Sequence, residues 1–82
     1  GFLADTPAPD EAESALIGEV ISRYLRGCKK RRRYIFMARF YAMKPVAEIA
    51  EGLEISESSV KRELAGIRKE LRTELEKEGI TV

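Results

Sequence analysis

The residues of this chain that are best suited to chemistry are cations gathered in one block. Residues 28–44 carry seven lysines and arginines and no acidic residue, although the net charge of all 82 residues is only +1. A concentrated basic block usually meets a polyanion or an acidic partner. The alternative is the solvated first turn of a helix, but cations at a helix start oppose the helix dipole. This mismatch slightly favours a binding role for Lys29, Lys30, Arg31, Arg32 and Arg33.

A second polar set follows a short apolar stretch and a turn. Ser56 is a good helix N-cap, and the residues directly after it are small, polar or basic. If residues 46–55 form a short helix and a tight turn, the N-terminal turns of the next helix are able to enter the major groove of DNA. Serine, lysine and arginine suit base edges and phosphates. The plain alternative is a helical hairpin in a small bundle, whose exposed helix is polar by default.

Catalytic and metal chemistry is disfavoured by what the composition lacks. Histidine is absent and Cys28 is the only cysteine, so the sequence holds no Ser-His or Cys-His pair, no disulfide framework and no multi-cysteine metal site. There is no glycine-rich phosphate loop either. We therefore expect no enzyme, no metal and no cofactor, and we interpret Cys28 as an incidental thiol. No apolar run approaches the roughly 20 residues that span a membrane, and no signal peptide is visible, which favours the cytosol.

Apolar periodicity and helix boundaries predict four helices. Residues 1–10 hold two of the three prolines and are expected to be a leader or linker before one domain over residues 11–82. The predicted helices span residues 10–26, 29–43, 46–52 and 57–78, and the last two form a helix-turn-helix. The fold class is therefore all-α: a small four-helix domain with a C-terminal helix-turn-helix and without winged elements.

The second and fourth predicted helices are expected to supply most of the core. Phe36 and Phe40 are assigned to it, and Ile55 is expected to help fill the angle between the last two helices. The fourth helix carries an apolar seam at helical spacing, made of Val60, Leu64, Ile67, Leu71 and Leu75.

Three glutamates in the fourth predicted helix are spaced four residues apart. Glu70, Glu74 and Glu78 are interpreted as a solvated stripe, because like charges at this spacing repel mildly and do not serve helix stability. Carboxylates are poorly placed near DNA. We therefore expect only the N-terminal half of this helix to meet a duplex.

Five stretches of the chain carry a resemblance to a known family. The first four are Arg33-x-x-Phe36-x-x-Arg39-Phe40, Val46-Ala47-Glu48-Ile49-Ala50-Glu51, Ile55-Ser56-x-Ser58-Ser59-Val60-Lys61-x-x-Leu64 and Arg68-Lys69-x-Leu71-Arg72. The fifth is the ending Leu75-Glu76-Lys77-Glu78-Gly79-Ile80. Together they resemble region 4, the C-terminal promoter-reading domain of sigma-70 family RNA polymerase sigma factors. The resemblance covers about residues 13–80, and its most specific part runs from Glu48 to Leu64.

The resemblance implies a helix-turn-helix that binds double-stranded promoter DNA at the −35 element. By position, it implies base-edge contacts for Glu57, Ser58, Lys61 and Arg62. It implies phosphate contacts for Arg39, Lys44, Ser59 and Arg68. In the family the first two helices form an apolar cup for the β flap of core RNA polymerase, which here suggests a patch of Tyr24, Leu25, Tyr34 and Tyr41. An anti-sigma protein as a further partner and a location in the bacterial cytoplasm follow from the same resemblance.

Two other functions stay open at this point. A helix-turn-helix regulator of the response-regulator or phage kind would bind operator DNA, often as a dimer, without touching the polymerase flap. A protein-interaction module would use the apolar face alone and would have no role on DNA.

The chain departs from the family pattern at three places. Glu54 stands where the family usually has glycine in the turn, and a non-glycine residue with positive φ is uncommon, so we expect either a different turn or some strain there. Gly66-Ile67 replaces the commoner Arg-Ala and removes one phosphate contact. Gly27-Cys28-Lys29 replaces the usual Leu-Pro at the entry to the second helix.

Overall fold

The computed structural model describes the backbone of residues 9–80 and the side chains of residues 13–80. This part of the chain forms four α-helices and no strand: α1 (Pro9–Arg26), α2 (Lys30–Phe40), α3 (Val46–Leu53) and α4 (Glu57–Lys77). The prediction of a small all-α domain with a C-terminal helix-turn-helix is confirmed. The leader predicted for residues 1–10 lies outside the described residues, except for Pro9 and Asp10, which belong to α1.

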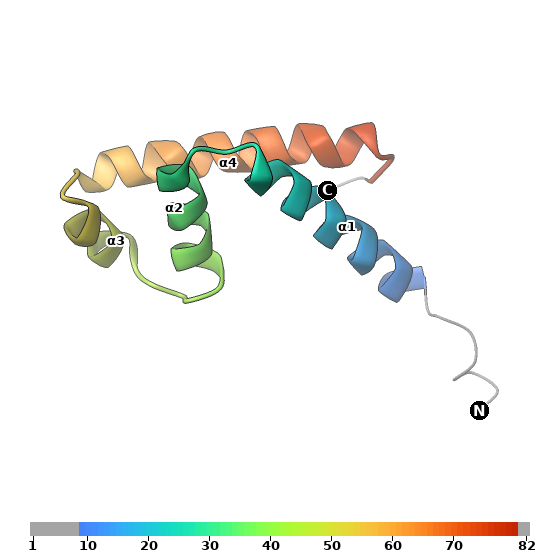
Figure 1. Cartoon of the computed structure of the whole chain (residues 1–82), viewed down its shortest axis with the longest axis horizontal. Helices are drawn as coiled ribbons and strands as arrows, with labels where there is room; N and C mark the ends of the chain where they lie inside the picture. Colours follow the sequence, from blue (N-terminus) through green and yellow to red (C-terminus); the bar gives the residue numbers. More distant parts are fainter. Residues whose placement is uncertain (1–8, 81–82) are drawn as a thin grey trace, which may run out of the picture.

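α4 is the longest element, and the other three helices pack against it. α1, α2 and α3 each contact α4, and α2 also contacts α3. Figure 1 shows α4 along one edge of the molecule, with α1, α2 and α3 all on the same side of it. The N-terminal end of α1 diverges from α4. One face of α4 is consequently left uncovered along the length of the helix.

Two apolar clusters hold the helices together. The main cluster lies between α2, α3 and α4, and its partly buried margin includes Leu71 and the turn residue Ile55. A second cluster joins Val20 of α1 to Leu75 of α4 and to Ile80 beyond the end of α4. The predicted seam of α4 is confirmed, because four of its five side chains are buried and Leu71 packs against the main cluster. The buried residues of the main cluster are Ile35, Phe36, Ala38, Ile49, Ala50, Val60, Leu64 and Ile67.

α2 ends at Phe40, three residues earlier than the predicted Met43. Met43 adopts a left-handed backbone conformation with φ 56°, and the Lys44 N–H donates to the carbonyl of Ala38 at 2.9 Å. The residue before a proline is disfavoured in the α conformation, so the chain turns out of the helix ahead of Pro45. Every other helix boundary lies within one residue of its prediction.

Phe40 was assigned to the core, and this prediction is wrong. Its side chain is 43% exposed, whereas Phe36 is only 6% exposed. The two rings lie with their centroids 4.9 Å apart and tilted by 40°. Because α2 ends at Phe40, no further turn of that helix covers the ring.

Candidate nucleic-acid interface

The turn between α3 and α4 is closed by a left-handed residue. The Ile55 N–H donates to the carbonyl of Ala50 at 3.0 Å, and the Glu54 N–H donates to the carbonyl of Glu51 at 3.2 Å, which is the Schellman pattern of a helix end. Glu54 adopts φ 57° and ψ 43° at the position that usually requires glycine. The tight turn therefore forms with glutamate in place, and an L-residue in this conformation is strained.

Ser56 caps the start of α4, as its residue type predicts. Its Oγ accepts a hydrogen bond from the Ser59 N–H at 3.0 Å and lies 2.9 Å from the Ser59 Oγ. A capped N-terminus keeps the first turn helical and its remaining N–H groups directed outward. The Ser59 hydroxyl is half-buried and already bonded to Ser56, which leaves it only part of its hydrogen-bonding capacity for another partner.

The four residues predicted to contact base edges lie together on the first two turns of α4. All four side chains are exposed, and none forms an ion pair or a side-chain hydrogen bond within residues 13–80. The intervening Val60 is fully buried, and its burial fixes the rotation of the helix so that these residues point away from the core. The exposed set consists of Glu57, Ser58, Lys61 and Arg62.

The residues predicted to contact phosphates come from two parts of the domain. Arg68 is exposed on α4, about two turns after Lys61. Arg39 lies in the last turn of α2, and its Nη1 donates to the carbonyl of Lys44 at 3.3 Å. The Nζ of Lys44 lies 5.9 Å from the ring centroid of Tyr34, within cation–π range. Arg39 and Lys44 are thus grouped at the α2–α3 connection, apart from Arg68.

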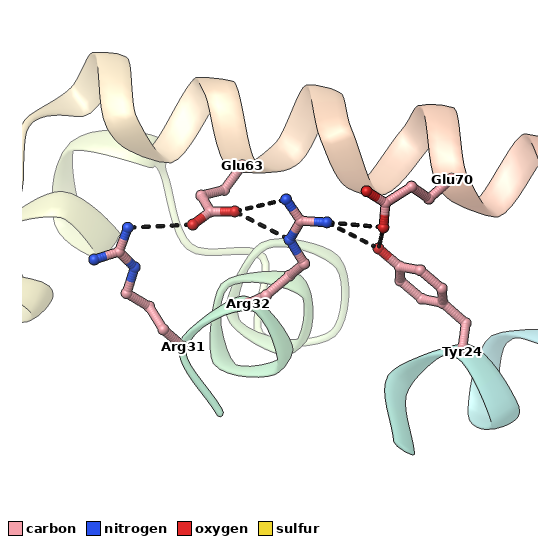
Figure 2. Close-up of polar contacts among 5 residues, drawn as sticks. All are labelled: Tyr24, Arg31, Arg32, Glu63 and Glu70. Carbon is pink, nitrogen blue, oxygen red and sulfur yellow. Dashed lines mark hydrogen bonds and ion pairs between the residues drawn. The ribbon is translucent and has the colours of Figure 1, made fainter. Parts of the chain in front are cut away.

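A chain of polar contacts joins α1, α2 and α4 (Figure 2). Arg32 of α2 lies between two carboxylates of α4, with nitrogen–oxygen distances of 2.9 Å to Glu63 and 2.8 Å to Glu70. Arg31 adds a pair with Glu63 at 3.2 Å, and the Tyr24 hydroxyl of α1 donates to Glu70 at 2.8 Å. The side chain of Arg32 is only 26% exposed, so its pairs are partly shielded from water. We call these five residues the Arg32 network.

The Arg32 network holds its carboxylates in the charged form. The hydrogen bond from Arg32 lowers the pKa of Glu63 below its usual value, and Arg31 adds to this effect. The pKa of Glu70 is lowered first by the Tyr24 hydroxyl and then by Arg32. Burial and the bond to Glu70 raise the pKa of Tyr24, so its hydroxyl stays a proton donor. At neutral pH the network is a set of fixed charges that cross-link three helices.

Gly66 provides the space in which Arg32 lies. A Cβ at this position would come 3.0 Å from Arg32 Nη2, which is tighter than nine in ten real Cβ contacts, so the guanidinium would have to shift slightly. Glu63, Gly66 and Glu70 are three and four residues apart and therefore share one face of α4. The departure from the family pattern at Gly66 thus coincides with an arginine of α2 that lies over the bare helix backbone.

The Arg32 network divides the basic run at the start of α2. Arg31 and Arg32 are directed at carboxylates of α4, whereas Lys29 and Lys30 are exposed and form no ion pair within residues 13–80. The interpretation of Glu70 as part of a purely solvated stripe is wrong, because its carboxylate accepts bonds from two other helices. The basic run is therefore partly structural.

Comparison with models of protein families identifies the chain. The family described as sigma-70, region 4, matches residues 19–71, which is more than half of the sequence and spans both the helix-turn-helix and the Arg32 network. The chain belongs to the sigma-70 region 4 family. Region 4 is a DNA-binding regulatory domain of transcription initiation and is not a known enzyme family. A search of curated proteins found no match to the chain.

This region 4 domain also has an open groove between α1 and α2, lined by both apolar and polar residues, with a volume of about 750 Å³. Ile21 and Leu25 line it from α1, Met37 lines it from α2, and Tyr41 lines it from the position directly after α2. Met37 is 42% exposed and Tyr41 is 68% exposed, so apolar surface faces water here. Sequence reasoning missed Ile21 and Met37, although each precedes a predicted patch residue by four positions, which is the spacing of neighbours on one helix face.

The residues predicted for a polymerase patch have different surroundings in the structure. Leu25 and Tyr41 lie in the α1–α2 groove. Tyr24 belongs instead to the Arg32 network, and Tyr34 lies beside Lys44 at the α2–α3 connection. Two of the four residues thus line the α1–α2 groove of this region 4 domain.

The described residues were compared with what a membrane span and a metal site require. Within them, no helix combines the length and apolar character needed to cross a membrane. No cluster of three potential metal-binding side chains occurs in the same part of the chain. Cys28 is a free, half-buried thiol in the connection between α1 and α2.

Proposed function

We propose that this region 4 domain reads the −35 element of bacterial promoters with the first two turns of α4. The observation that carries the proposal is the exposure of Glu57, Ser58, Lys61 and Arg62 on one capped helix end. In helix-turn-helix proteins the second helix lies in the major groove, and its N-terminal residues contact base edges. α3 supports this geometry, because its left-handed turn at Glu54 sets the angle at which α4 begins.

Each of the four exposed side chains has a suitable partner among the base edges. Arg62 is able to bind the O6 and N7 of guanine in a bidentate manner, and Lys61 suits the same atoms or a phosphate. The Glu57 carboxylate accepts from the amino group of cytosine, and the Ser58 hydroxyl suits either kind of edge. We therefore expect guanine and cytosine among the bases that the first two turns of α4 contact.

Phosphate contacts on both sides of the groove fix the register of the helix on the duplex. In this proposal they come from Arg39 and Lys44 at the α2–α3 connection and from Ser59 and Arg68 of α4. Lys29 and Lys30 add contacts at the start of α2, since both are exposed and unpaired within residues 13–80.

The second half of the proposal concerns the polymerase itself. We infer that the α1–α2 groove receives the β flap of RNA polymerase through Leu25 and Tyr41, helped by Ile21 and Met37. Met37 and Tyr41 expose apolar side chains to water at this groove, and exposed apolar surface on so small a domain supports its use as an interaction surface. In this proposal the domain works in the bacterial cytoplasm as the promoter-reading part of a sigma-like factor.

Selection of duplexes from a random pool tests the DNA half. Arg62→Ala is expected to reduce the preference for the selected duplex over random duplex by about tenfold or more, since a bidentate base contact contributes about 1–3 kcal/mol of discrimination. Lys61→Ala is expected to weaken binding to both duplexes. Arg26→Ala, which removes a cation far from α4's start, is the control and leaves discrimination unchanged. Unaltered duplex binding by both Arg62→Ala and Lys61→Ala would refute the assignment.

Retention of core RNA polymerase tests the flap half. The domain is expected to retain polymerase, and retention is lost when the flap tip is deleted or when Tyr41 and Met37 are changed to alanine. Retention that survives both changes contradicts the groove assignment. Absence of retention, with salt-sensitive duplex binding preserved, would instead show a regulator that binds operator DNA without the flap.

A further inference from the structure

The uncovered face of α4 carries five cations between residues 61 and 72. All five side chains are exposed, and none forms an ion pair within residues 13–80. In Figure 1 this helix lies along the side of the molecule opposite α1, α2 and α3. We call the set the outer stripe; it consists of Lys61, Arg62, Arg68, Lys69 and Arg72.

The charges of α4 are sorted by face. Glu63 and Glu70 are turned toward α2, where Arg32 binds both, and Glu74 pairs with Lys77. The outer face between Lys61 and Arg72 therefore presents cations and the small exposed Ala65, with no carboxylate among them. Two of the three glutamates behind the expectation that only the N-terminal half of α4 meets a duplex are thus paired with other helices, Glu70 with Arg32 of α2 and Glu78 with Arg23 of α1.

The outer stripe is long enough to follow a nucleic-acid strand. Its ends, Lys61 and Arg72, are separated by about 16 Å along the axis at 1.5 Å per residue. Phosphates follow one another along each strand of B-DNA, so cations spread over this length are able to face more than one phosphate. Lys69 and Arg72 lie beyond the turns that are proposed to read bases.

We propose that Lys69 and Arg72 bind the phosphate backbone of the promoter duplex, so that the outer face of α4 contacts DNA over about three turns rather than at its N-terminal end alone. The proposal deepens the proposed DNA-binding function and rests on it. The contacts carry no sequence information and add affinity through the release of counterions.

The chemistry of the stripe favours DNA over an acidic protein as its partner. The stripe is continuous with Lys61 and Arg62, which already belong to the proposed reading surface. The cores of protein–protein interfaces are enriched in aromatic residues and methionine and depleted in charge. No exposed aromatic residue or methionine occurs on α4 within the described residues, whereas the large exposed apolar side chains lie in α2 and the turn after it.

The test measures duplex affinity as a function of salt concentration for the wild-type chain and for two double variants of equal charge. Lys69→Ala with Arg72→Ala removes two cations of the stripe. Arg26→Ala with Lys77→Ala removes two exposed cations elsewhere, one on α1 and one paired with Glu74. Alanine is a good helix former at these exposed positions, so both double variants are expected to fold.

The stripe variant is expected to lower the slope of log affinity against log salt by about 1.8, or about 0.9 for each lost phosphate contact. Its preference for the selected over the random duplex stays that of the wild type, and the control changes the slope by much less. Equal slopes for the stripe variant and the control overturn the proposal. So does an unchanged slope combined with lost binding of polyglutamate, which would assign the stripe to an acidic protein. If the wild-type chain shows no salt-dependent duplex binding, the proposed function itself fails.

Discussion

Glu54 is the residue at which the helix-turn-helix is most strained. Its left-handed backbone, at φ 57°, brings the Cβ of an L-residue close to its own carbonyl, at a cost of about 1–2 kcal/mol. It also places a carboxylate at the C-terminal end of α3, where the helix dipole disfavours anions. Neither effect is offset by a hydrogen bond or ion pair of the Glu54 side chain within residues 13–80.

Glu54→Gly is therefore expected to raise the free energy of unfolding by about 1 kcal/mol. Glycine adopts the left-handed conformation without strain, and part of the gain is cancelled by the greater entropy of the unfolded chain. Urea unfolding followed by far-UV circular dichroism measures the difference.

Glu51→Gly is the matched control, since Glu51 is exposed and lies in α3 only three residues away. Glycine within a helix costs up to about 1 kcal/mol relative to good helix formers, so this variant is expected to be less stable than the wild type. A loss of stability in both variants would show that the turn is not strained at Glu54.

At the level of single residues, the sequence predicts what depends on local chemistry. The helix cap at Ser56 and the backbone strain at Glu54 follow from residue type and from position in a turn. The half-exposed ring of Phe40 does not, because its exposure depends on where α2 ends, and that is decided by Met43 and Pro45.

At the level of elements, the fit between α2 and α4 depends on a missing side chain. The guanidinium of Arg32 lies next to Gly66, where an added Cβ would come 3.0 Å from its Nη2. Glycine lowers the intrinsic helix preference of α4 at this position. The guanidinium that lies there pairs with Glu63 and Glu70.

Gly66→Ala is expected to have different effects with and without Arg32. In an Arg32→Ala background the new methyl group meets no guanidinium, so the variant gains the full helix preference of alanine, about 1 kcal/mol. In the wild-type background the gain is smaller, because Arg32 must shift away from its carboxylates. Urea unfolding of the four proteins gives the coupling free energy, and identical effects in both backgrounds would mean that Gly66 does not serve Arg32.

The helices themselves were predictable, but their polar connections were not. Apolar spacing within one helix locates α4 and its buried seam. The two carboxylates of the Arg32 network are 31 to 46 residues away from the side chains that bind them, and no local period relates them. The same reason explains why the five cations of residues 29–33 were treated as one set, although two of them bind α4.

At the level of the whole molecule, α4 separates two surfaces. One side of α4 meets the other three helices through the apolar clusters and the Arg32 network, and the other side is the outer stripe. The charges of the network thus contribute to stability, whereas those of the stripe remain available for a ligand. A change of pH acts on the first set without altering the second, since arginine and lysine stay charged in acid.

The stability of the molecule is expected to fall in acid through Glu63 and Glu70. Both carboxyl groups have a pKa below the usual 4.5 in the folded chain. Between that lowered pKa and 4.5 the unfolded chain binds more protons, so the free energy of unfolding decreases as the pH falls through this window. Above about pH 5 the contribution of the two groups is fully present.

Arg32→Ala connects this pH dependence to the network. At about pH 7 the variant is expected to be less stable than the wild type by about 1 kcal/mol, since its ion pairs are only partly shielded from water. The difference should shrink as both proteins are unfolded with urea at decreasing pH, because protonated Glu63 and Glu70 no longer gain from the guanidinium. Arg26→Ala, whose side chain has no ion pair within residues 13–80, should differ from the wild type by the same amount throughout. A constant difference for Arg32→Ala down to about pH 3 would mean that Arg32 stabilises the three-helix junction by packing alone, without its charge.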